Sequence, residues 1–293
     1  MKAFYHSSDL DGHCSGAIIK DCFPECEMIG INYGQEFPWD KIQKDEQVFM
    51  VDFTLQPFDL MERLRELAYL IWIDHHKTEV QEAARRGFNC GGIRRIGTGA
   101  CELVWKYCMP GDPTPLAVQL LSEYDVWNHT DPRTLPFQYG VRMKANTYPD
   151  NQTFWGRLFN DDGYVRQFTL DGDMILKYEG QQNAKFCRAY AFETILVTPD
   201  HYANASLPTA RVLIAICANR GFTNSKVFDS VYDPAKHDLM ITFCRLKPPA
   251  HKWTVSLYST KPEVDCGAIA KAYGGGGHQG AAGFQCETLP FEH

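Results

Sequence analysis

The chain has 293 residues, of which 44% are hydrophobic and 22% charged, a composition that excludes a largely disordered protein and leaves room for two globular domains. The formal net charge of -7 disfavours unspecific binding to long nucleic acid, which depends on many Lys and Arg contacts to phosphates. The 11 cysteines have no CxxC spacing, so neither a disulfide framework nor a zinc ribbon is indicated.

The first half of the chain alternates short apolar runs with helical patterns. The runs predict buried strands at residues 2–5, 27–31, 47–51 and 68–73. Between them, helices are predicted at residues 12–22 and 58–67. Such alternation is typical of a parallel sheet with helices on both faces, so the predicted fold class is α/β.

Helical patterns continue beyond the predicted sheet. Residues 100–108 follow Thr98, which is a candidate N-terminal cap, and a further helix is predicted over residues 116–123. Residues 128–162 are rich in turn formers and are expected to be irregular. A long helix is predicted over residues 164–190.

The last third of the chain has the pattern of a smaller α/β domain. Strands are predicted at residues 194–198, 211–217, 238–245 and 253–258, and a helix at residues 264–273. We therefore expect an N-terminal domain at residues 1–162, a connecting helix at 163–191 and a C-terminal domain at 192–293.

Three of the predicted strands run into acidic residues and histidines. In chain order, these are His6, Asp9, Asp11, Asp52, Asp74, His75 and His76. Asp125, near the end of a predicted helix, is a candidate to join them. Because the carboxyl ends of parallel strands share one edge of a sheet, we expect these side chains to converge into a ligand site.

Carboxylates crowded at one edge repel one another and raise each other's pKa unless cations lie among them. Carboxylate and imidazole ligands without thiolate suit Mn2+ better than a structural zinc, with Mg2+ and Co2+ as alternatives. Two such ions can hold a bridging water, lower its pKa and bind the phosphoryl oxygens. The cluster therefore predicts two divalent metal ions and hydrolysis of a phosphate ester.

Each of these residues alone has a simpler explanation. A single Asp after a strand is most often a turn residue or a helix cap, and a single His at an apolar edge is most often packed. Their joint occurrence at several strand ends favours metal binding. The other histidines lack this support and are expected to be structural, namely His13, His129, His237 and His251.

These motifs resemble those of the DHH phosphoesterase superfamily, which is named after the triplet seen here at residues 74–76. The segment from His6 to Asp11 is similar to the family's first motif, Asp52 to its second and Asp125 to its fourth. The resemblance covers roughly the first half of the chain and includes the order and spacing of all four motifs. It identifies residues 1–162 as the catalytic, metal-binding domain.

The resemblance also implies a role for each of these residues. One metal would be bound by His6, Asp9 and Asp52, and the second by Asp11, Asp52, His75 and Asp125. Asp52 would bridge the two ions, and His76 would contact the substrate phosphate. Asp74 would orient a ligand by a hydrogen bond, so the catalytic residues would be Asp52, Asp74 and His76.

A glycine-rich segment, residues 274–284, follows the last predicted helix. A backbone free of side chains lets amide N–H groups approach an anion, although a linker or a tight turn is the alternative. The segment resembles the glycine-rich motif of the DHH-associated C-terminal domain of nanoRNases, oligoribonucleases and cyclic-dinucleotide phosphodiesterases. This resemblance implies substrate binding by Gly275, Gly276, Gly277 and His278. It also implies an active site in the cleft between the two domains.

Tyr258 stands where many nanoRNases carry an Arg that contacts phosphate. A phenol can stack on a base or donate one hydrogen bond, but it cannot form the bidentate contact of a guanidinium group. Arg245, on a neighbouring predicted strand, is the candidate substitute. Both residues are therefore included in the expected substrate-binding set.

The function expected from these features is Mn2+-dependent hydrolysis of short oligonucleotides or small nucleotides to nucleoside monophosphates. The alternatives are hydrolysis of a cyclic dinucleotide or a 3′,5′-bisphosphate nucleotide, and a non-catalytic regulator that binds nucleotides. No run of about 18 apolar residues is present, so we expect a cytoplasmic protein with no membrane association and no track for long nucleic acid. A homodimer is left open.

Overall fold

The computed structural model describes residues 1–198 and 212–292. Arg211, the first residue of one predicted strand, lies outside the described residues. The chain forms two compact units, Met1–Leu176 and Lys177–His293. Among the helices described, none combines the length and the apolar character that crossing a membrane requires.

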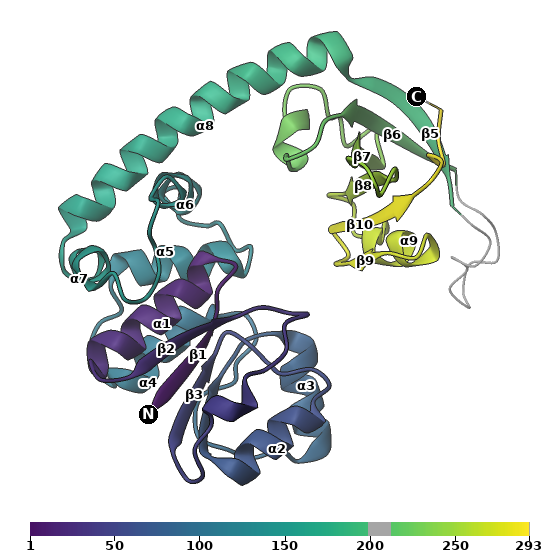
Figure 1. Ribbon diagram of the computed structural model, residues 1–293. Helices are drawn as coiled ribbons and strands as arrows, with labels where there is room; N and C mark the ends of the chain where they lie inside the picture. The colour runs from purple at the N-terminus through teal and green to yellow at the C-terminus, as the bar shows by residue number, and fades with distance from the viewer. Residues whose placement is uncertain (199–211, 293) are drawn as a thin grey trace. The chain divides into compact units, whose positions relative to one another are not determined.

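Helix α8, Asp162–Tyr190, belongs to both units and corresponds to the long helix predicted from the sequence (Figure 1). Val165 and Phe168, in its first half, are buried in a core of the first unit. Cys187, in its last turn, is buried in a core of the second unit. The boundary between the units therefore falls within a continuous helix.

The first unit contains a four-stranded parallel sheet in the order β2-β1-β3-β4 (Figure 1). Its strands are β1 Lys2–His6, β2 Glu27–Ile31, β3 Gln47–Val51 and β4 Tyr69–Ile73. Each begins and ends within one residue of the predicted run, because a strand buried on both faces reads as a continuous apolar segment. The parallel sheet with its helices confirms the predicted α/β class.

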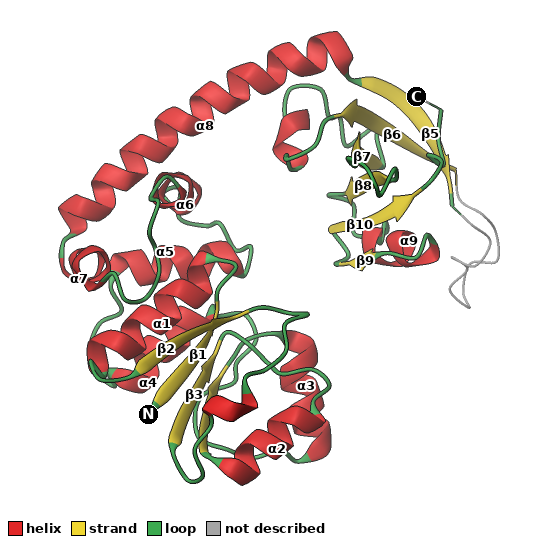
Figure 2. Cartoon of the chain, in the orientation of Figure 1, coloured by secondary structure: helices red, strands yellow, loops and turns green. Residues whose placement is uncertain are grey.

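Alternate side chains of the central strands enter two separate cores, one on each face of the sheet. Phe49 and Val51 of β3 pack against the helices of the first face, which are α1 Leu10–Cys22, α4 Ala100–Cys108 and α5 Leu116–Asp125. Val48 and Met50 pack on the second face, which carries η1 Trp39–Lys41, α2 Asp59–Leu67 and α3 Lys77–Arg86. Figure 2 shows these helices on both sides of the sheet.

Residues 128–162 are not irregular, so the prediction for this stretch is wrong. They contain α6 Thr134–Arg142 and α7 Gln152–Asn160. Both helices are nine residues long, and α6 includes Pro136 and Gly140, so local propensity gives little helical signal. Phe137 and Trp155 are fully buried, which indicates that tertiary packing stabilises these helices.

Two glycines allow α6 to pack closely on the first half of α8. A Cβ at Gly140 would lie 1.9 Å from the carbonyl oxygen of Phe168. A Cβ at Gly172 would lie 1.7 Å from the carbonyl oxygen of Pro136. Because both neighbours are backbone atoms, the two helices would have to separate to admit a side chain.

We expect Gly172→Ala to lower the free energy of unfolding of the first unit by about 1–3 kcal/mol. Gly156→Ala, on α7 of the same unit, is the matched control, since a Cβ there would meet nothing within 4 Å. This control is expected to raise stability by about 0.5–1 kcal/mol. Thermal unfolding followed by circular dichroism measures both changes, and equal Tm values for the two variants would contradict the packing described.

The second unit is built on a six-stranded mixed sheet in the order β5-β6-β7-β8-β10-β9. Its strands are β5 Phe192–Val197, β6 Val212–Asn219, β7 Leu239–Arg245, β8 Trp253–Tyr258, β9 Gly276–Gly277 and β10 Ala281–Cys286. The helices described between them are η3 Ser225–Phe228 and α9 Cys266–Ala272. The sequence predicts the strands up to β8 and the helix α9, but it does not predict the hairpin of β9 and β10.

Candidate metal centre

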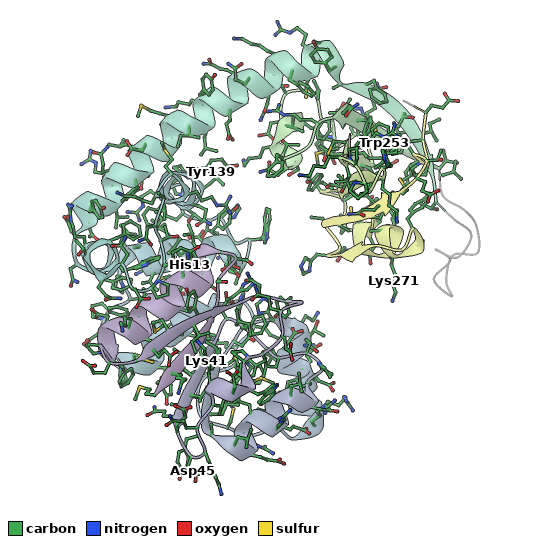
Figure 3. The ribbon with its side chains drawn as sticks, viewed as in Figure 1. His13, Lys41, Asp45, Tyr139, Trp253 and Lys271 are labelled. Carbon is green, nitrogen blue, oxygen red and sulfur yellow. The ribbon has the colours of Figure 1, made fainter. Side chains whose placement is uncertain are left out.

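The candidate ligands lie where the strands of the first sheet end. His6 is the last residue of β1, and Asp9 caps α1 by accepting a hydrogen bond from its first turn. Asp52 directly follows β3 and has a φ of 55°, in the left-handed region that an L residue rarely adopts. Asp74 directly follows β4, whereas Asp45 lies at the opposite edge, in the turn before β3 (Figure 3).

His6, Asp9 and Asp52 form a first group of ligand atoms, all within 4.8 Å of one another. The Nδ1 atom of His6 lies 2.7 Å from Oδ2 of Asp9 and 3.6 Å from Oδ2 of Asp52. The set of one nitrogen and two carboxylates suits a divalent cation.

Asp11, His75 and Asp125 form a second group of ligand atoms at the same edge. The Nε2 atom of His75 lies 3.1 Å from Oδ2 of Asp125 and 3.6 Å from Oδ2 of Asp11. It also lies 3.3 Å from Oδ1 of Asp52. The two oxygens of Asp52 therefore face different groups, as a ligand that bridges two ions requires.

Three buried atoms of these groups lack hydrogen-bond partners within the described part of the chain, which is the state expected of ligands for a bound cation. They are Nδ1 of His6, Oδ1 of Asp52 and Nε2 of His75, and none makes a hydrogen bond with the residues that the structure describes. Buried polar atoms are almost always hydrogen-bonded, so a group of three such atoms calls for a specific explanation. Bound divalent cations would satisfy these nitrogen and oxygen atoms without hydrogen bonds.

The cluster contains more carboxylates than positively charged groups, so negative charge is in excess. Burial raises the pKa of Asp11 and of Asp52, and neighbouring carboxylates raise it further. Burial alone would lower the pKa of the histidines, but carboxylates outweigh it and raise the pKa of His6 to about 10 and that of His75 to about 11. A divalent cation supplies the positive charge that these groups otherwise take from protons.

Asp74 is fully buried, and both of its oxygens are used in hydrogen bonds. Oδ1 accepts hydrogen bonds from the amides of His75 and His76 at 2.7 and 3.1 Å, and it lies 2.7 Å from Nδ1 of His76. Oδ2 accepts hydrogen bonds from Oγ1 of Thr54 at 2.6 Å and from Nε1 of Trp72 at 3.2 Å. Asp74 also belongs to a third group of possible metal ligands, with Asp52, His75 and His76, but both of its oxygens are already engaged in these hydrogen bonds. Thr54 and Trp72 are supporting residues that the sequence did not reveal.

Asp11 has a structural role besides its place in the second group. Its carboxylate oxygens accept hydrogen bonds from the amides of Ala100 at 2.7 Å and Cys101 at 2.8 Å, at the start of α4. The residue that precedes α4 is Gly99, so the prediction that Thr98 caps this helix is wrong. The carboxylate that takes the place of this cap comes from α1, some 90 residues earlier. Its negative charge interacts favourably with the positive end of the helix dipole.

The glycine-rich segment forms a β-hairpin in the second unit. A Cβ at Gly275 would lie 2.1 Å from the carbonyl oxygen of Gly283, and one at Gly277 would lie 2.5 Å from Cα of Ala282. Close packing within the hairpin therefore accounts for these two glycines. Gly276, where a Cβ would meet open space, and the exposed side chain of His278 remain the members best placed to meet a ligand.

Tyr258 and Arg245 are not neighbours. In the antiparallel pair of β7 and β8, Tyr258 lies opposite Met240, while Arg245 lies opposite Trp253 at the other end. The two residues are thus separated by almost the whole length of the strands, because register places residues five apart at about 17 Å. The guanidinium group of Arg245 lies over the ring of Trp253, so Arg245 does not take the place of an Arg at Tyr258.

Two of the histidines outside the cluster, His13 and His237, have packing partners. His13, on α1, lies 2.8 Å from Oγ1 of Thr147 through Nδ1 and 3.1 Å from the carbonyl oxygen of Ser7 through Nε2 (Figure 3). His237 is buried in the second unit, and its Nδ1 accepts the amide of Asp233. These contacts are structural ones.

No protein-family model matches the sequence. An uncharacterized protein, R106, of Acanthamoeba polyphaga mimivirus is 24% identical over 279 residues, which is 89% of this chain. The chain spans only 58% of the length of that relative.

Solved structures are similar over nearly the whole chain. A pGpG-specific phosphodiesterase from Vibrio cholerae matches with a TM-score of 0.58 and 11% identity, over 97% of this chain and 92% of its own. An exopolyphosphatase-related protein from Bacteroides fragilis matches with a TM-score of 0.44 and 14% identity, over 98% and 87%. The first match establishes that the chain shares the fold of that phosphodiesterase.

Proposed function

We propose that this protein is a metal-dependent phosphoesterase of the DHH type, which hydrolyses a phosphodiester bond in a short oligonucleotide or a small nucleotide. The observation that carries this proposal is the convergence of two ligand groups on buried nitrogen and oxygen atoms that have no hydrogen-bond partner among the described residues. The fold shared with a pGpG-specific phosphodiesterase supports a dinucleotide as the substrate class.

Two divalent cations, with Mn2+ as the first choice, would be bound by the two groups. His6, Asp9 and Asp52 would hold one, and Asp11, Asp52, His75 and Asp125 the other. Ions bound there would lower the pKa of a water molecule and neutralise charge on the phosphoryl oxygens. The chain's own contribution is to fix the ligand positions, through a buried Asp52 and an Asp11 tied to the start of α4.

His76 is the residue proposed to contact the substrate phosphate. Its side chain is 35% exposed, and its Nδ1 is engaged by the buried Asp74, so Nε2 is the atom left for a ligand. A donor fixed in this way stabilises charge that develops on a phosphoryl oxygen without reorganisation. Asp74 would act as a positioning residue, because it is fully buried and its Oδ1 lies 2.7 Å from Nδ1 of His76.

The second unit is proposed to bind the nucleotide through the hairpin of β9 and β10. The backbone at Gly276 and Gly277 is exposed, and His278 adds an exposed imidazole donor. Tyr258 lies opposite Ala281 at the start of β10, beside this hairpin. Since Arg245 is at the far end of the sheet, it is not part of this proposal.

The function is tested by a substrate panel with the purified protein in Mn2+. The panel contains pGpG, a short RNA, a cyclic dinucleotide, a 3′,5′-bisphosphate nucleotide and pyrophosphate, with products separated by chromatography. We expect nucleoside monophosphates to be released from pGpG or short RNA, and turnover to stop when the metal is chelated. Nucleotide binding with no turnover of any member would instead identify a non-catalytic regulator.

A further inference from the structure

Three aromatic rings stack directly beside the candidate ligand Asp125. They belong to Tyr124, Trp127 and His129, which we call the aromatic stack. The Trp127 and His129 rings lie 5.3 Å apart at 28°, and the Tyr124 and His129 rings lie 5.3 Å apart at 22°. Trp127 is 74% exposed, so the stack presents a large aromatic surface.

The backbone holds Trp127 in this exposed position at a cost. Its φ is 56° and that of His129 is 39°, both in the left-handed region that is unfavourable for bulky L residues. Such strain persists only where the surroundings enforce it, and it concentrates at functional sites. The exposure of an indole ring is a second unfavourable feature, because burial of this apolar surface would be favourable.

Several contacts fix the segment that carries the stack. The carboxylate of Glu123 accepts hydrogen bonds from Oγ1 of Thr130 at 2.8 Å and from the amide of Asp131 at 2.7 Å. Behind the stack, Arg142 donates a hydrogen bond to the Tyr124 hydroxyl at 3.2 Å, and its guanidinium group lies 5.2 Å from the centre of that ring. The aromatic surface is therefore preorganised.

The stack lies within reach of a nucleotide whose phosphate is at the metal centre. Trp127 is two residues after Asp125, so their Cα atoms are at most about 7 Å apart. Asp125 in turn lies 3.1 Å from His75. Tyr33, another aromatic residue at this edge, is 47% exposed and offers less free surface than Trp127, because its ring packs on Phe53 at 4.5 Å and against His6 at 5.7 Å.

We propose that the exposed face of Trp127 stacks on a nucleobase of the substrate, so that the enzyme selects phosphodiesters carrying a base next to the cleaved bond. This inference rests on the proposed function and adds the substrate feature that the first unit recognises. Base stacking on an aromatic side chain tolerates any base, since every base has a π-face. Selection is therefore for a nucleotide over a simple phosphate ester, and not for one base over another.

The test compares pGpG with its abasic analogue, in which hydrogen replaces the bases. For Trp127→Leu, we expect kcat/KM for pGpG to fall about 10- to 100-fold, mainly through KM, and kcat/KM for the abasic analogue to stay within about twofold. Trp127→Phe, which keeps a ring, is expected to retain most of the activity on pGpG. Tyr69→Leu is the control, since Tyr69 is 68% exposed but begins β4, at the opposite edge of the sheet.

Two outcomes would overturn the inference while the proposed function stands. One is unchanged turnover of pGpG by Trp127→Leu, and the other is an equal loss on pGpG and on the abasic analogue, which would show a role in the shape of the segment only. Calorimetric binding of guanosine monophosphate and of ribose 5-phosphate tests the stacking inference separately from the proposed function, because it does not depend on turnover. If the wild type hydrolyses nothing, the proposed function fails, but the inference survives only if Trp127→Leu weakens binding of the nucleotide and not of the sugar phosphate.

Discussion

Asp52→Asn is expected to lower kcat/KM for pGpG about 1,000-fold or more, with Mn2+ binding lost in parallel. Both oxygens of Asp52 face ligand groups, and Asn replaces one of them with an amide NH2 that cannot bind a cation. In metal-free buffer the variant should be at least as stable as the wild type, because burial outweighs the contacts with His6 and His75, raises the pKa of Asp52 and so disfavours its ionised form. Its loss of activity is therefore not a loss of fold.

The increase in thermal stability on adding Mn2+ tests the metal centre without any measurement of turnover. Mn2+ at 100 times its Kd should stabilise the wild type by about 2.7 kcal/mol for each ion bound, and this increase should be largely absent in Asp52→Asn. Asp45→Asn is the matched control, since Asp45 has a similar φ of 60° but lies exposed at the opposite edge. Equal metal-dependent shifts in Tm for Asp52→Asn and the wild type would contradict the metal centre.

Asp74→Asn is expected to lower both stability and kcat, while Mn2+ is still bound. An amide at this position brings its own N–H donors against those of Thr54, Trp72 or His76, so at least one buried donor loses its acceptor. We expect the free energy of unfolding of the first unit to fall by about 1–3 kcal/mol. We also expect kcat to fall about 10- to 100-fold, because His76 is no longer held in one orientation.

Thr54→Val separates the two effects of Asp74. It removes one donor to Oδ2 and leaves the hydrogen bonds of Oδ1 to the segment of His75 and His76 intact. It should therefore lower stability with little change in kcat. A kcat for Thr54→Val as low as that of Asp74→Asn would show that the buried network as a whole, and not the orientation of His76, controls turnover.

The first sheet could be predicted because its strands carry their information locally. A run such as residues 47–51 is apolar throughout and is buried on both faces, so burial can be read from the sequence itself. The convergence of His6, Asp52 and His75 follows from the rule that parallel strands end at one edge. The ligand assignment itself was implied by family resemblance and stays a prediction.

The features that the sequence did not reveal depend on distant partners. Helix α6 contains Pro136 and Gly140, and its place is set by close contact with the backbone of α8. Arg245 was misplaced because the register of β7 against β8 cannot be read from either strand alone. Trp127 was overlooked because neither its left-handed backbone nor its exposure leaves a mark in the sequence, and an aromatic residue after a helix usually packs.

The two duties of Asp11 constrain how this protein can diverge. A substitution of Asp11 also removes the acceptor of two amide hydrogen bonds at the start of α4. A relative that lost catalysis through this substitution would therefore lose stability as well. Asp125 is 28% exposed, and its carboxylate lies 3.1 Å from Nε2 of His75, so its replacement leaves no helix amide without an acceptor and should cost less stability. Among relatives without catalytic activity, we therefore expect substitutions at the position of Asp125 to be more frequent than at the position of Asp11.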